Sequence, residues 1–156
     1  YIYMKRIYYL SFLLFLILFS CEKSKQNVYK LSAINFNIEM KLEKNNSFLR
    51  EYKRYLVISS KDNNEIESVR LKDDNGTGAN SYLYEDVGSY IIIDCDGTWY
   101  SLNKKTGDLH LIGNFWLKYP PKNYLGTFVL TSSNKKINFI KQEKIKLNDI
   151  YKYGGG

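Results

Sequence analysis

Two carboxylates close one of the most apolar segments of the chain. Asp94 and Asp96 follow residues 90–93 (YIII), and Gly97 comes next. Paired carboxylates can act as nucleophile and general acid–base, or they can bind a hard cation. A calcium loop needs five or more oxygen ligands at set spacing, and this segment offers two. The Asp96-Gly97 pair is also one of the strongest short hairpin signals, so it predicts a turn between two strands.

The octapeptide at residues 91–98 (IIIDCDGT) resembles the first motif of the haloacid dehalogenase superfamily, in which an apolar strand precedes D-x-D-G-T. The resemblance implies that Asp94 is a phosphoryl nucleophile and Asp96 a general acid–base. Residues 128–132 (FVLTS) are similar to the second motif of that family.

The surroundings of this motif favour a hairpin over a phosphatase. That family's fold requires a parallel sheet with helical crossovers, whereas residues 99–126 contain short apolar runs, glycines and prolines. The later acids Glu143 and Asp149 are separate, and His110 is the only histidine. A zinc site or a nucleophile–base pair needs more such residues. We therefore expect no metal, no cofactor and no enzymatic activity, and keep an Asp-dependent phosphatase as an alternative.

The first twenty residues have the composition of an export signal. Lys5 and Arg6 form a positive head, residues 7–19 are an almost unbroken apolar run, and Ser20 precedes Cys21. Such a head, an apolar core of about 7–15 residues and a small residue at the cleavage site describe a secretory signal. The run is shorter than the roughly 20 residues that a membrane span needs.

Residues 18–21 (LFSC) resemble the lipobox of bacterial lipoproteins. The resemblance implies that the Cys21 thiol receives a diacylglyceryl group, and two acyl chains give stable membrane anchoring. We expect residues 1–20 to be the signal peptide, residues 21–29 the lipidated cysteine and a polar tether, and residues 30–153 a β domain. The protein is then held by lipid at the cell envelope, facing the periplasm or the cell surface. Cys95 has no disulfide partner if Cys21 is acylated.

Charge is unevenly spread over the 156 residues, which carry a formal net charge of +7. Residues 62–96 hold nine acidic residues against two basic ones, whereas residues 118–156 hold eight lysines against two acidic residues. Such a dipolar surface can steer a charged partner, or it can keep loops and strand edges soluble. The lysines lack interleaved arginines and a recognisable reading element, so we expect no nucleic-acid partner.

Short alternating segments separated by turn clusters predict a mainly β fold. Residues 35–42 alternate polar and apolar, and 15 tyrosines favour pleated surfaces. Helical periodicity is scarce, although residues 47–54 and 147–153 could each form a short helical turn. We expect one antiparallel meander of about eight strands, curled into a barrel or folded as a sandwich. The predicted strands are residues 35–42, 52–59, 65–71, 81–84, 90–94, 98–102, 109–115, 127–131 and 137–141.

Aromatic residues gather in the central and later part of the chain. If they are exposed beside the acidic loop at residues 73–78, they would form a protein-binding patch, because Tyr and Trp dominate interface hot spots. If they point inward, they form the β core. The candidate partner-binding residues are Asp73, Asp74, Tyr82, Tyr84, Trp99 and Tyr100.

These features predict a non-catalytic envelope lipoprotein that binds another protein. The mature region resembles the small lipidated immunity proteins that neutralise toxins. Residues 76–82 (GTGANSY) are similar to the inhibitory loop of membrane-bound C-type lysozyme inhibitors, which implies a hydrolase as partner. A structural subunit of an envelope complex is the alternative.

Overall fold

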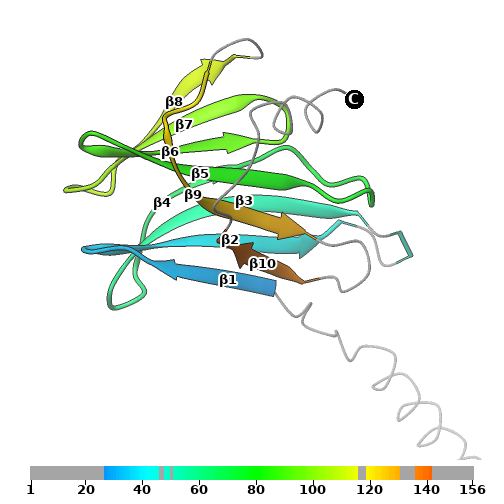
Figure 1. The fold of residues 1–156 in the computed structure, drawn as a ribbon. Helices are drawn as coiled ribbons and strands as arrows, with labels where there is room; N and C mark the ends of the chain where they lie inside the picture. Colours follow the sequence, from blue (N-terminus) through cyan, green and yellow to red (C-terminus); the bar gives the residue numbers. More distant parts are fainter. Residues whose placement is uncertain (1–26, 46–47, 50, 116–118, 131–135, 142–156) are drawn as a thin grey trace, which may run out of the picture.

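All regular structure in the described part of the chain is β-strand. The computed structural model describes residues 27–45, 48–49, 51–115, 119–130 and 136–141, and these form two antiparallel sheets (Figure 1). The four-stranded sheet runs in chain order through β1 (Asn27–Ser32), β2 (Phe36–Lys44), β3 (Tyr52–Ser60) and β4 (Glu65–Arg70). The six-stranded sheet has the order β10 (Ile137–Ile140), β9 (Asn123–Leu130), β5 (Asn80–Asp86), β6 (Ser89–Asp94), β7 (Thr98–Asn103), β8 (Leu109–Asn114).

The mainly β, antiparallel class is confirmed, in the form of a sandwich and not of a closed barrel. β1 to β4 and β5 to β8 are two meanders, whereas β9 returns to pair with β5 and β10 pairs with β9. This return brings β10, an edge strand of the six-stranded sheet, into contact with β1, an edge strand of the four-stranded sheet (Figure 1).

The main core forms between the sheets because the strands alternate. In β2 the side chains of Phe36, Ile38, Met40 and Leu42 are all buried and belong to one cluster. They pack with inward residues of the other sheet, among them Leu83 of β5. Burying one face of each strand in this way supplies most of the stability of a two-layer fold.

The described residues form ten strands, one more than the segments we predicted, and the additional one is β1. Its six residues (NVYKLS) are too few and too polar to stand out by periodicity, and pairing with β2 along its whole length fixes it. β1 begins at Asn27, within the region expected to be tether. The helical turn expected at residues 47–54 is wrong over its last part, since Tyr52 begins β3 and pairs with Lys44.

The six-stranded sheet buries apolar side chains on both faces. Leu83 and Ile92 point to the main core, whereas their neighbours point outward and form a second cluster with Trp99 of β7. Phe115 and Tyr124 pack against this outer-face cluster. Its buried members are Tyr82, Tyr84, Ile91, Ile93 and Trp99.

A β-bulge re-aims the edge strand β8. Trp99 pairs with Gly113 and Tyr100 pairs with Leu111, so Ile112 is the extra residue. A bulge twists a strand locally and redirects a side chain. Gly113 has φ of 149°, and a Cβ there would lie 2.9 Å from Cζ of Phe115. Glycine therefore lets Phe115 pack closely over this end of the sheet.

Candidate functional site

The structure buries the four aromatic residues that we expected to be candidates for partner binding. Tyr82 is 1%, Tyr84 3%, Trp99 4% and Tyr100 7% exposed. The first three lie in the outer-face cluster and Tyr100 in the main core. These side chains therefore build the sheet, and the expected exposed patch is not made of them.

The two acidic candidates are engaged within the fold. Asp74 is buried, its backbone bridges to Tyr52, and its Oδ1 accepts a hydrogen bond of 2.9 Å from the Gly78 N–H. The Asp73 carboxylate is paired at 2.7 Å with the Arg70 guanidinium. Glu65, Glu85 and Asp94 pair with lysine or arginine residues from outside residues 62–96, so part of the acidic excess of this segment is neutralised locally.

Residues 76–82, which resemble an inhibitory loop, also turn inward at their end. Ser81 and Tyr82 are buried in β5, and only the preceding turn reaches solvent. A partner could contact Thr77, which is exposed, but not the Tyr82 ring.

Asp94 forms a buried ion pair that joins the two sheets. Its Oδ1 lies 2.9 Å from Nη2 of Arg54 in β3, and both side chains are at most 1% exposed. The Ser81 hydroxyl donates to Oδ1 at 2.8 Å, and the Lys72 N–H donates to Oδ2 at 3.1 Å. Both carboxylate oxygens are therefore occupied. A phosphoryl nucleophile must reach its substrate, and the parallel sheet of that alternative is absent among the strands described.

The segment after Asp94 forms the predicted hairpin. Cys95, Asp96 and Gly97 connect β6 to β7, and Gly97 takes φ of 79°, as three-residue hairpin loops require. Burial raises the pKa of the Cys95 thiol to about 11, and the nearby Asp94 charge adds to the shift. The thiol is thus protonated at neutral pH and is a poor nucleophile.

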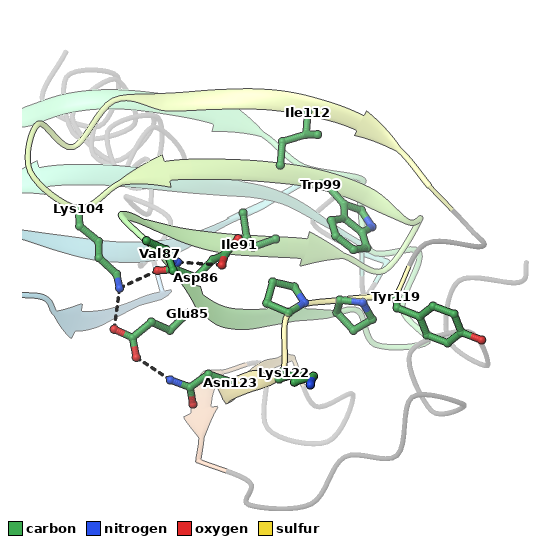
Figure 2. A pocket seen from close by; sticks show the side chains of 12 residues that line it. Glu85, Asp86, Val87, Ile91, Trp99, Lys104, Ile112, Tyr119, Lys122 and Asn123 are labelled. Carbon is green, nitrogen blue, oxygen red and sulfur yellow. Dashed lines mark hydrogen bonds and ion pairs between the residues drawn. The ribbon is translucent and has the colours of Figure 1, made fainter.

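An open groove of about 800 Å³ lies on the outer face of the six-stranded sheet (Figure 2). Ile91 of β6 and Trp99 of β7 line it from the sheet, and Ile112 of β8 stands beside Trp99. The Pro120-Pro121 segment before β9 lines its other side. The β8 bulge thus places an apolar side chain in the groove, and the volume is typical of binding sites.

One end of the groove is charged. Nζ of Lys104 lies 2.7 Å from Oε1 of Glu85 and donates to the Asp86 carbonyl oxygen at 2.9 Å. It also lies 5.1 Å from the centroid of the Tyr90 ring. Oε2 of Glu85 accepts a hydrogen bond of 2.7 Å from the Asn123 amide. These contacts join β5, the turn after β7 and the start of β9.

The other end is apolar and aromatic. Tyr119 is 75% exposed and lies at the end opposite Lys104 (Figure 2). The Trp99 indole, which also lines the groove, packs edge-on against Phe115, with ring centroids 6.0 Å apart. Ile112 and, at the tip of the β5–β6 hairpin, Val87 remain exposed around the groove.

Of the residues that line this groove, the sequence singled out only Trp99. Ile112, Lys104 and Glu85 have the residue types of ordinary strand or turn positions. The available signal was the run YIII in β6 beside Trp99. Such a run predicts burial on both faces of a strand, so it points to a covered outer face.

The remaining predictions concern residues that lie outside the described ranges. Cys21, the signal peptide, most of the tether and the helical turn at residues 147–153 lie outside them. Within the described ranges, no helix is long and apolar enough to span a membrane, and no three His, Cys, Asp or Glu side chains cluster as metal ligands.

No protein-family model, curated protein or solved structure matches this chain.

Proposed function

We propose that this chain is an envelope lipoprotein that binds a protein partner in the groove on the outer face of its six-stranded sheet. The groove is the observation that carries the proposal. It exposes Val87, Ile112 and Tyr119 around an apolar floor, and its rim carries charged and amide groups. Protein interfaces share this plan of an aromatic, apolar centre inside a polar rim.

The two ends of the groove indicate an amphipathic partner segment. An apolar or aromatic side chain would pack between Tyr119 and Ile112. A polar or charged side chain would lie at Glu85 and Lys104. A small polar metabolite would leave the exposed apolar groups in water, so an extended peptide segment of a protein suits the whole length better. An immunity or hydrolase-inhibitor function would use the same surface.

Anchoring follows from the N-terminal sequence. The lipobox at residues 18–21 implies acylation of Cys21, and the first strand begins at Asn27. A module anchored this close to a bilayer meets partners within the envelope without a further targeting segment.

Site-specific photocrosslinking in living bacteria tests the groove. The full chain carries a photoreactive phenylalanine in place of Tyr119 and, as the matched control, in place of Ile66 on the edge strand β4. We expect a discrete protein adduct from position 119 and none from position 66, because Ile66 is exposed but does not line the groove. Ile112→Glu in the same chain should abolish the adduct.

The outcomes separate a partner site from a merely sticky surface. Adducts of equal intensity from both positions, or an adduct that Ile112→Glu leaves unchanged, would overturn the proposal. Incorporation of radiolabelled palmitate tests the anchor independently. The Cys21→Ser variant should lose the palmitate label, and the Cys95→Ser variant should keep it.

A further inference from the structure

A second hollow, of about 390 Å³, lies between the two sheets, on the opposite face of the six-stranded sheet from the groove. β1, β2, β5, β6, β9 and β10 all contribute to it. Ile38 and Leu83, which line its interior, are at most 1% exposed. Its volume falls in the range of about 300–1,000 Å³ that small-molecule sites occupy.

Most of the lining is apolar or aromatic, and Ser32 and Lys141 are the exceptions. Leu31, Tyr90, Leu125 and Phe139 are only half-buried although they pack against the main core. Apolar side chains in a core normally pack against one another, because an empty space between them costs dispersion contacts. Water gains little here, since an apolar cavity offers it few hydrogen-bond partners. The hollow is therefore better filled by an apolar molecule than by solvent.

An irregularity of β9 helps to keep the hollow open. Leu83 pairs with Gly126 and Tyr84 pairs with Tyr124, so Leu125 is an extra residue. This bulge turns Leu125 toward the hollow, whereas the Tyr124 ring packs against Tyr84 on the outer face. At Gly126 a Cβ would lie 2.5 Å from the Phe139 ring. The close approach of β9 and β10 thus depends on glycine.

Lys141 is the only charged residue of the lining, and it is exposed directly after β10. A second cation, Lys61, donates a hydrogen bond to the carbonyl oxygen of Ala33, which also lines the hollow. No acidic side chain belongs to the lining in the described part of the chain. An anionic group at this end would find positive charge and no opposing carboxylate.

We propose that this interior hollow binds a fatty acid, with its alkyl chain between the sheets and its carboxylate at Lys141. The alkyl chain would cover the exposed parts of Leu31, Leu125 and Phe139. The site is independent of the partner groove, which lies on the other face of the six-stranded sheet.

Photolabelling of the full chain in membranes with a diazirine analogue of palmitic acid tests this site. Mass spectrometry should map the label to residues 31–33, 90 and 124–125, and unlabelled palmitate should compete it away. Ala33→Phe, which places a ring in the hollow, should reduce labelling of these residues to background while the thermal unfolding midpoint is kept. The competition measurement needs only the unmodified chain, so it decides even if Ala33→Phe fails to fold.

The carboxylate is tested with Lys141→Glu and, as the matched control, Lys136→Glu before β10. Lys141→Glu should weaken labelling by the acid about two- to fivefold, the range of a solvent-exposed charge contact. The corresponding alcohol and a lysophosphatidylcholine carrying the same diazirine chain should label the unmodified chain less than the acid does. Label that is spread over the surface, or that palmitate does not displace, would overturn the site. Equal labelling by acid and alcohol would overturn the assignment to a fatty acid.

Discussion

The outer faces of the two sheets have opposite chemistry. On the outer face of the four-stranded sheet, two residues of β2 form ion pairs with neighbouring strands. Glu39 pairs with Lys30 of β1 at 3.3 Å, and Lys41 pairs with Glu65 of β4 at 3.5 Å. On the six-stranded sheet the outward residues are tyrosine, isoleucine and tryptophan, and they are buried. On the four-stranded sheet the outward residues of β2 and β3 are mostly polar, and several of them are buried, among them Asn37, Glu39 and Ser59. On the six-stranded sheet the outward residues form a second apolar cluster with a groove beside it.

This difference teaches which face of the sandwich is built for contact. A sheet that needs only one core can solvate its outer side with ion pairs. Covering a second face requires aromatic residues, a bulge at Ile112 and glycine at position 113. These features support a groove and have no counterpart in the outward residues of β2 and β3. Arg54 is the exception on the four-stranded sheet, since it points inward to Asp94.

The largest expected effect comes from removing the buried ion pair between Arg54 and Asp94. Asp94→Ala leaves the Arg54 guanidinium buried without its counter-ion, which should lower the free energy of unfolding by about 3–5 kcal/mol. Urea unfolding of the purified chain measures it. Asp73→Ala, at the exposed pair with Arg70, should leave the midpoint almost unchanged. Equal effects of the two variants would contradict the role of Asp94 as a link between the sheets.

Truncation of the outer-face cluster should come next. Trp99→Ala removes a buried indole and should lower the free energy of unfolding by about 3–5 kcal/mol. The loss is smaller if Phe115 moves into the space that the indole leaves. Tyr55→Ala, on the outer face of β3, is the matched truncation, and we expect only a slight shift of the midpoint. Thermal unfolding followed by circular dichroism compares them. Equal unfolding midpoints of the two variants would contradict the difference between the two outer faces.

Changing the groove without changing the fold should affect binding alone. Ile112 is 39% exposed, so Ile112→Glu should alter stability by no more than about 0.5 kcal/mol. It should nevertheless remove the photoadduct from position 119, because a carboxylate would be desolvated against the partner. Ile66→Glu on β4 should retain the adduct. Loss of the adduct in both variants would point to a general effect of charge.

The smallest effect is a pH dependence at the β6–β7 hairpin. The folded state raises the pKa of Cys95 from 9.0 to about 11, so the unfolded chain loses its thiol proton first. The contribution of this group to stability is therefore full below pH 9 and is lost as the pH rises to about 11. Cys95→Ser should flatten this part of the stability curve. If stability depends on pH in the same way in Cys95→Ser and in the unmodified chain, the Cys95 thiol has the same pKa in the folded and unfolded states, which contradicts the prediction.

Much of the fold follows from local sequence, and the site does not. Alternation over residues 35–42 and the Asp96-Gly97 turn predict strands and a hairpin that the structure contains. The pairing of β9 with β5 depends on contacts far apart in the chain, so no local pattern indicates it. The same holds for the inward turn of Arg54 and for the position of Ile112, which a one-residue bulge decides.

Hydroxyl-radical footprinting of the full chain, in intact cell envelopes and after purification, tests the difference between the outer faces most directly. If the groove holds a protein partner, modification of Val87, Ile112 and Tyr119 should be strongly reduced in the envelope. Tyr55 and Lys53, on the outer face of the other sheet, should be modified equally in both samples. Equal modification of the groove residues in the two samples, or protection confined to Tyr55 and Lys53, would contradict the account.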